Sequence, residues 1–130
     1  MTDRRVEYRV AGQAEPISHF TDAVAAGGLL FVSGIVPVDG RGQLVGGDDV
    51  VAQAQKVFAN MADVLATAGC TFADVVKVTV FLTDVNDRPL INPVRQEVFA
   101  DSRPASTLVE VSALVIPGAR IEVDAVAVLP

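Results

Sequence analysis

Apolar residues recur along this chain with two periodicities, that of a strand and that of a helix, which predict six strands and two helices. Alternating or continuous runs of Val, Leu, Ile and Phe are typical of strands. We expect strands at residues 5–10, at two stretches within residues 23–36 that flank a Gly27-Gly28 turn, and at residues 75–83, 108–114 and 120–128. The segment 38–47 contains four glycines and is expected to form a loop.

The first helix has the strongest pattern. Its apolar residues follow one another at spacings of three and four and form one stripe: Val50, Ala54, Val57, Phe58, Met61 and Leu65. Polar residues such as Gln53 and Asn60 are expected on the solvent side. Asp48 and Asp49 suit the positive N-terminal end of a helix, and Gly69 suits its C-terminal stop. An amphipathic helix of this kind covers one face of a sheet.

A second helix is expected around residues 87–100. Pro89 and Pro93 lack an amide donor and are tolerated only near a helix start. The regular part is therefore expected to begin close to Pro93.

Two of the strands have distinct faces. In residues 75–83, one face carries Val76, Val78, Val80 and Leu82, and the other carries Lys77, Thr79 and Phe81. In residues 120–128, one face carries Ile121, Val123, Ala125 and Ala127, and the other carries Glu122, Asp124, Val126 and Val128. After the short edge strand at residues 5–10, the predicted order β-β-α-β-α-β-β indicates an α+β sandwich, with one sheet and both helices on the same side. The other sheet face is too apolar to stay bare.

Composition supports an assembly of several copies. The 130 residues fit a single domain, residues 1–130, that is long enough to bury a core without disulfides or metal. Hydrophobic residues make up 51% of the chain. Since a small domain has a large surface for its volume, we expect other copies to cover part of that surface.

Charge and residue counts exclude several classes of function. The net charge of −6, without any basic run, argues against nucleic-acid binding. No apolar run is long enough to cross a bilayer, and the first five residues, Met1-Thr-Asp-Arg-Arg, lack the apolar core of a signal peptide. A lone Cys70 fits a reducing, cytoplasmic location. With one His and one Cys, we expect no metal, and no motif indicates a cofactor.

Five segments in a fixed order resemble a known family. They are Ile17-Ser-His-Phe20, Phe31-Val-Ser-Gly-Ile-Val-Pro37, Val75–Leu82, Asn92 and the block Arg103–Val128. Together they resemble the Rid family (reactive-intermediate deaminase or YjgF, RidA-like), which is also labelled endoribonuclease L-PSP. The resemblance implies a chorismate-mutase-like homotrimer, in which sheets of three subunits pack into a barrel. It also implies a small-molecule site in each cleft between subunits.

The resemblance also implies roles for individual residues. Glu122 matches the glutamate that holds or activates a water, and it is the expected catalytic residue. Phe20 stands where a tyrosine is usual, and Leu108 stands where a cysteine is usual. The expected substrate-binding residues are Phe20, Ser33, Asn92, Arg103, Ser106 and Thr107.

Ser106 stands where the deaminating branch of the family has an arginine that binds the substrate carboxylate. An arginine donates two parallel, charge-assisted hydrogen bonds, whereas a serine hydroxyl makes one neutral bond. This loss should weaken carboxylate binding by about 1.5–3 kcal/mol. Arg103 or Arg95 could supply a guanidinium instead. Because Arg103 lies three residues upstream and Arg95 lies on the second helix, neither side chain begins at the position of the missing arginine, and we expect that neither replaces it. The ordinary substrates, 2-iminobutanoate and 2-iminopropanoate, are therefore not expected.

Several positions keep two interpretations. From spacing alone, Glu122 and Asp124 are better explained as solvated, or as paired with Arg120 or Lys77, and only the resemblance favours catalysis by Glu122. The Ser33-Gly34 pair is either a bulge or a place of close backbone approach.

Two further residues could have either a structural role or a role in catalysis. Cys70 is expected to be buried packing rather than a nucleophile. His19 is expected on the surface rather than at work in the cleft.

Two function classes remain open. The leading one is hydrolysis or tautomerisation of a small enamine, imine or related carbonyl compound, without the arginine. The alternative is a non-catalytic trimer that binds a small ligand or a partner on the same scaffold. Retention of Glu122 and Asn92 favours the enzyme, whereas loss of the arginine, tyrosine and cysteine favours the binding protein.

Overall fold

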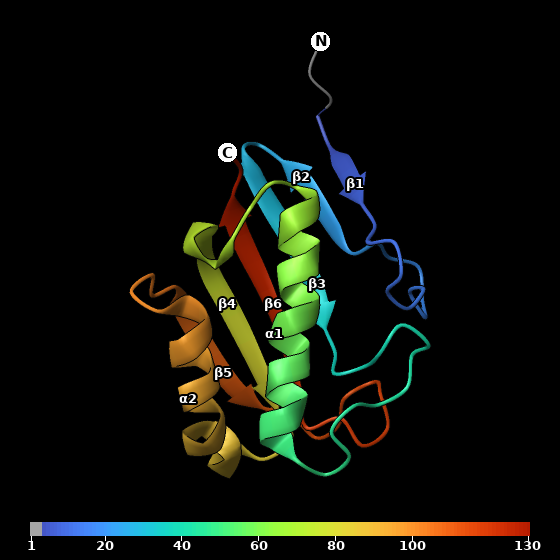
Figure 1. Cartoon of the computed structure of the whole chain (residues 1–130), viewed down its shortest axis with the longest axis vertical. Coiled ribbons are helices and arrows are strands. Elements are labelled where there is room, and N and C mark those ends of the chain that lie inside the picture. Colours follow the sequence, from blue (N-terminus) through green and yellow to red (C-terminus); the bar gives the residue numbers. More distant parts are fainter. Residues whose placement is uncertain (1–3) are drawn as a thin grey trace.

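The computed structural model describes residues 4–130 and contains one mixed sheet covered by two helices (Figure 1). The elements are β1 (Val6–Tyr8), β2 (Ala23–Ala26), β3 (Leu29–Ile35), α1 (Val50–Thr67), β4 (Val75–Leu82), α2 (Arg88–Phe99), β5 (Ala105–Glu110) and β6 (Ile121–Val128), with short 3₁₀ turns at Phe72–Asp74 and Val85–Asp87. Residues 1–3, where the expected domain starts and where no signal peptide is expected, lie outside the described part.

The sheet order is β1-β2-β3-β6-β4-β5, and only β4 and β5 run parallel. Both helices lie on the same face of this sheet (Figure 1). The predicted α+β class, with one mixed sheet and both helices on one side, is confirmed. No helix within residues 4–130 has the length and apolar character needed to span a membrane.

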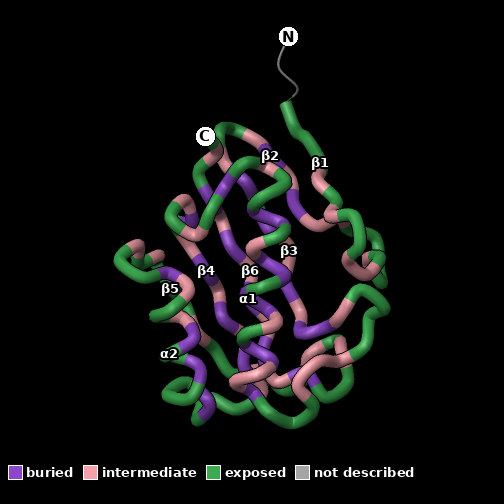
Figure 2. The backbone as a smooth tube through the Cα atoms, in the orientation of Figure 1, coloured by how far each residue is buried: buried purple, intermediate pink, exposed green. Residues whose placement is uncertain are grey.

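The core lies between the helices and one face of the sheet (Figure 2). Phe58, Met61 and Leu65 of α1 are buried there, where the helix packs against β3 and β6. The inward face of β6 is the predicted one, since Ile121, Val123, Ala125 and Ala127 are all buried. Cys70 is buried as expected, and burial raises the pKa of its thiol, which disfavours a nucleophilic thiolate. His19 is exposed, also as expected.

Helix α1 begins and ends where the sequence indicates. The Asp49 carboxylate caps it by accepting hydrogen bonds from the backbone amides of Val51 at 3.0 Å and Ala52 at 3.3 Å. Gly69, with a φ of 76°, takes the left-handed conformation that follows many helices.

The prediction that Gln53 and Asn60 face solvent is wrong, because both are buried. Gln53 lies three residues after Val50 and four before Val57, and Asn60 lies three after Val57, so both belong to the apolar stripe. The Gln53 side chain donates to the carbonyls of Gly47 at 2.7 Å and Gly118 at 3.1 Å. It also accepts a hydrogen bond from the Arg120 amide at 2.7 Å. These bonds fix two loops at the end of the sheet.

Replacing Gln53 by the similarly sized Leu should therefore lower the free energy of unfolding by about 3 kcal/mol, because buried backbone groups would lose their only side-chain partner. Urea denaturation measures the effect. Gln55→Leu on the exposed face of the same helix is the matched control and should change stability by less than about 0.5 kcal/mol. Equal stability of the two variants would contradict this role of Gln53.

Strand β4 differs from its predicted pattern at one residue. The pairing with β6 shifts between Val75 and Lys77, so that Val76 is an extra residue at a bulge. Val76 is therefore 44% exposed, and Val75 takes the buried position in its place. From Lys77 onward the predicted faces are correct.

Helix α2 begins at Arg88 rather than near Pro93. Pro89 occupies the first turn, where no amide donor is needed. Pro93 lies inside the helix and removes one backbone hydrogen bond. Asp87 directly precedes the helix. Its buried carboxylate caps no amide of α2 but accepts two hydrogen bonds from Arg120, at 2.8 and 2.9 Å.

Strand β5 spans Ala105–Glu110, not residues 108–114 as predicted. Its length follows from its partner, because β4 pairs with it from Lys77↔Ala105 to Leu82↔Glu110 and then ends. The apolar residues after Glu110 have no strand to pair with and form a loop.

Candidate functional site

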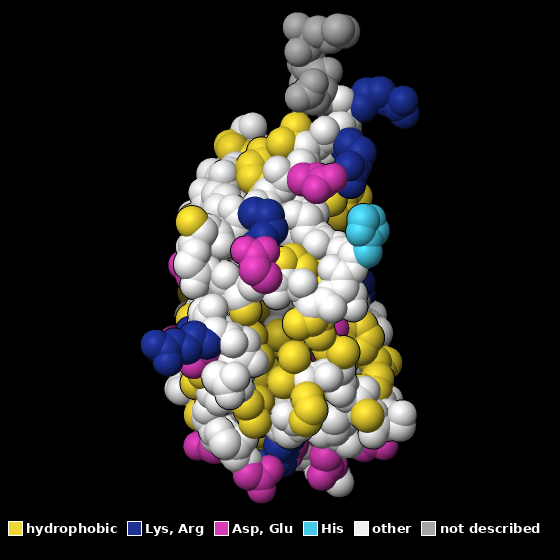
Figure 3. Space-filling view, turned by 90° about the vertical axis from the view of Figure 1, so that its right-hand side faces the viewer, with side chains coloured by type: hydrophobic (Ala, Val, Ile, Leu, Met, Phe, Trp, Pro, Cys, Tyr) yellow, Lys and Arg dark blue, Asp and Glu magenta, His cyan; other side chains and the backbone are white. Residues whose placement is uncertain are grey.

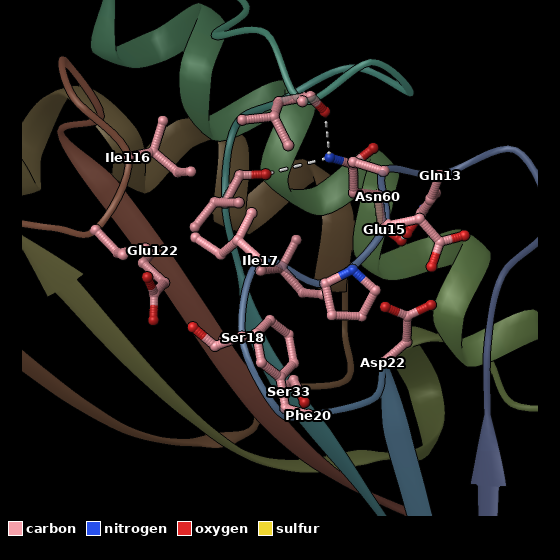
Figure 4. A pocket seen from close by; sticks show the side chains of 18 of the residues that line it. Gln13, Glu15, Ile17, Ser18, Phe20, Asp22, Ser33, Asn60, Ile116 and Glu122 are labelled. Atoms are coloured by element: carbon pink, nitrogen blue, oxygen red, sulfur yellow. Dashed lines mark hydrogen bonds between the residues drawn. The ribbon is translucent and has the colours of Figure 1, made fainter.

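A pocket of about 810 Å³ lies where β3 leaves the sheet. The N-terminal loop, the loop after β3 and the loop before β6 surround it, and Figure 3 shows hydrophobic side chains gathered on this side of the molecule. Three of the residues expected in the site, Phe20, Ser33 and Glu122, line this pocket together (Figure 4).

The backbone of β3 makes room for Glu122. Pairing between β3 and β6 shifts from Val32↔Ala125 to Ile35↔Val123, which is a β-bulge at Ser33 and Gly34. A Cβ atom on Gly34 would lie 2.2 Å from Oε2 of Glu122. Both interpretations of this pair are therefore correct, since the bulge creates the close approach of backbone and carboxylate.

Glu122 is partly buried and has no counter-ion among residues 4–130. Burial and, to a lesser degree, repulsion from Asp124 raise the pKa of its carboxyl group. The cations that might have neutralised it have other partners: Arg120 pairs with Asp87, and Lys77 donates to Thr107 at 2.6 Å. Within residues 4–130 no donor hydrogen-bonds to Glu122. Its carboxylate is therefore available to a ligand and has a raised proton affinity.

Asp124 differs from Glu122, although both lie on the same face of β6. Its Oδ1 accepts a hydrogen bond from the Thr79 amide of β4 at 3.1 Å. Asp124 therefore has a structural role, since it accepts a backbone hydrogen bond from the neighbouring strand.

Two walls of the pocket are fixed by backbone contacts. The Ser33 hydroxyl donates to the Thr21 carbonyl at 2.6 Å, so that it is already engaged, and Phe20 is 48% exposed beside it. Asn60 donates to the carbonyls of Val36 at 3.2 Å and Val38 at 2.9 Å, the bonds drawn in Figure 4. Asn60 was missed as a site residue, although its spacing on α1 placed it on the buried stripe.

A second cluster lies at the β5 edge of the sheet. Ser106 is level with Val78 and shares its face, the one covered by the helices. There it accepts a hydrogen bond from Nη2 of Arg95 in α2 at 2.8 Å. Asn92 is exposed one helical turn before Arg95.

The two remaining predicted residues lie apart from this cluster. Thr107 points to the opposite face of β5, where Lys77 binds it. Arg103 is exposed before the strand and makes no side-chain hydrogen bond or ion pair within residues 4–130.

The two clusters do not meet within one chain. Glu122 lies on the open face of β6, whereas Ser106 lies on the helix face of β5, with β4 between these strands. A site that uses both clusters needs two copies of the chain.

Residues 11–129 match the model of a family described as Endoribonuclease L-PSP. The chain is a member of the Rid family. It is 40% identical over 114 residues to a RutC family protein of Pyrococcus horikoshii, covering 87% of this chain and 89% of that protein. It is 38% identical over 113 residues to the human 2-iminobutanoate/2-iminopropanoate deaminase, covering 86% of this chain and 81% of that protein.

Solved structures of Rid proteins have the same fold. The Rid family protein YyfA of Yersinia pestis has a TM-score of 0.90 at 31% identity, covering 96% of this chain and 99% of that one. The YjgF gene product of E. coli has a TM-score of 0.86 at 30% identity, covering 95% and 98%. The predicted RidA-like sandwich is thus confirmed.

Proposed function

We propose that this Rid protein hydrolyses a small imine or enamine in clefts between the subunits of a homotrimer, with Glu122 as the catalytic residue. The observation that carries the proposal is the unpaired Glu122 carboxylate in the pocket, which the Gly34 bulge accommodates. Relatives named as imine deaminases support the reaction class.

The reaction requires a base and then an acid at one position. Glu122 accepts a proton from water as the water oxygen bonds to the carbon of the C=N group, and it returns this proton to the nitrogen, which gives a carbinolamine. Glu122 then takes the hydroxyl proton of the carbinolamine and passes it to the amine nitrogen as the carbon–nitrogen bond breaks, so that ammonia leaves and a carbonyl compound remains. A carboxyl group with a raised pKa suits this role, since its carboxylate is a stronger base toward water than an ordinary carboxylate is.

Two observations support the trimer. Apolar side chains remain exposed on the open face of the sheet, including Phe31 at 47% and Val128 at 45%. The Glu122 pocket and the Ser106 edge lie on opposite faces of the sheet and can form one site only between two copies. We therefore assign Asn92 and Ser106 to the neighbouring side of each cleft.

Because Ser106 offers one neutral hydrogen bond where the deaminating branch has an arginine, we propose that the side chain at position 106 does not itself bind the acid group of the substrate as it does in that branch.

The test is a panel of freshly generated imines and enamines, followed by ammonia release from the purified protein. Turnover of at least one compound above the rate in buffer is the expected result. If no compound is hydrolysed while one binds, the protein is a ligand-binding trimer instead, and the enzymatic proposal is wrong.

Gly34→Ala should lower kcat/KM on any hydrolysed imine by about 100-fold, because the added methyl group displaces the Glu122 carboxylate and misplaced groups lose about this much. The protein should still fold, since Gly34 does not have a positive φ and the clash involves only the mobile end of a side chain. Thermal unfolding checks the fold. Native activity in Gly34→Ala would show that the position of this carboxylate is unimportant.

A further inference from the structure

Arg95 is a cation without a counter-ion in the described part of the chain. It is partly buried between α2 and β5, and burial lowers the pKa of its guanidinium. Within residues 4–130 no carboxylate lies within ion-pair distance of it. By contrast, Arg120 is bound by Asp87, and that hydrogen bond raises the pKa of Arg120. Removing a charge from water without giving it a partner costs free energy, and the attraction to a bound anion offsets that cost.

Ser106 holds this guanidinium at the sheet edge. Nη2 of Arg95 donates to Oγ of Ser106 at 2.8 Å, which uses one of the five guanidinium N–H groups. Because the Ser106 oxygen is the acceptor, its own hydroxyl hydrogen can point to another group. Ser106 is exposed, so the remaining donors of both side chains can reach a ligand.

From this pair we infer an anion subsite in which Arg95, oriented by Ser106, binds the acid group of a carboxylate-bearing imine. The inference rests on the proposed function for the reaction, but it identifies the binding residue by its own geometry. Arg95 is thereby the specificity-determining residue and Ser106 its positioning residue. The acid group is bound by a guanidinium from helix α2, not by a side chain that extends from position 106. This inference departs from the expectation that nothing replaces the arginine, and the Arg95–Ser106 contact is the observation that supports it.

The subsite is tested first by binding, without any turnover. Isothermal titration compares 2-oxobutanoate, the carbonyl product of an imino acid, with its uncharged amide. The native protein should bind the acid more tightly, and Arg95→Gln should reduce affinity for the acid by roughly 10- to 100-fold while leaving the amide unchanged. Arg95→Lys should recover part of the loss. Arg88→Gln, an exposed arginine at the start of the same helix, is the control and should bind both compounds as the native protein does.

Kinetics then separates the roles of the two residues. On any hydrolysed imino acid, Arg95→Gln should raise KM more than it lowers kcat, and Ser106→Ala should do the same to a smaller extent. Equal affinity of the native protein for acid and amide would overturn the subsite. So would an Arg95→Gln variant that only dissociates the oligomer, since Arg95 would then pair with a carboxylate of another copy. Selective acid binding without any imine turnover would instead support the subsite and contradict the proposed reaction.

Discussion

Glu122→Gln should lower kcat/KM for imine hydrolysis by about 10²- to 10⁴-fold, the usual contribution of a general acid–base group. The amide keeps the shape of the side chain but can neither take nor return a proton. Because Glu122 has no hydrogen-bond donor or counter-ion within residues 4–130, the substitution breaks no contact in the chain. Steady-state ammonia release measures the effect.

Asp124→Asn is the matched control for Glu122→Gln. It lies two residues along the same face of β6, and an Asn oxygen can still accept the Thr79 amide. Its activity should remain within a few-fold of native. Equal losses in the two variants would show that the charge of this face, and not proton transfer by Glu122, sustains the reaction.

The raised pKa of Glu122 also makes stability depend on pH. The folded protein holds the Glu122 proton more tightly than the unfolded chain does, so the folded state binds more protons between the ordinary value of 4.5 and the raised pKa. The free energy of unfolding therefore falls as pH rises through this window. Glu122→Gln should abolish this decrease in the free energy of unfolding. At pH values above the raised pKa of Glu122, the variant should therefore be more stable than the native protein. Activity should instead rise with pH, because the carboxylate is the form that takes a proton from water.

Phe31→Asp should convert the proposed trimer to monomers. Phe31 lies on the open sheet face at 47% exposure, and a carboxylate buried there between copies would cost about 3–5 kcal/mol, or at least about 100-fold in association. Hydrolysis should disappear with the trimer, since Glu122 and Ser106 cannot meet in one chain. Sedimentation velocity and the imine assay, run on the same sample, measure both effects.

Val85→Asp is the control for assembly. Val85 is similarly exposed, at 44%, but lies in the turn before α2, away from the sheet face. This variant should remain trimeric and active. A monomeric native protein, or an active monomeric Phe31→Asp, would contradict a site between subunits.

The fold could be predicted from the sequence because its periodicities are strong. Alternation on β6 and the stripe on α1 gave the layers, and the family pattern gave the sandwich. The predictions failed where a single residue departs from the periodic pattern of its strand or helix. Val76 breaks the alternation at a bulge, and Gln53 is a polar side chain that satisfies buried backbone groups. The start of β5 depended on the length of β4, which is a property of pairing and not of the β5 sequence itself.

The candidate site could be predicted only in part. Matching residues identified Glu122, Ser33 and Phe20, which the structure brings into one pocket. The sequence did not reveal that Ser106 and Thr107 point to opposite faces, because the predicted strand 108–114 left both residues out, whereas β5 begins at Ala105. Arg95 and Ser106 are 11 residues apart in the sequence and belong to a helix and a strand, respectively. Local sequence patterns do not predict a contact between two such side chains.

The most direct test of the composite site mixes two variants that are each nearly inactive at substrate concentrations below the native KM. Glu122→Gln loses one half of each cleft, and the double variant Asn92→Ala/Arg95→Gln loses the other. Unfolding and refolding an equal mixture should give mixed trimers in which about a quarter of the clefts combine two native halves, so about a quarter of native hydrolysis should return. Mixed trimers that remain inactive, with both parent variants correctly folded and assembled, would show that the two clusters do not form one site.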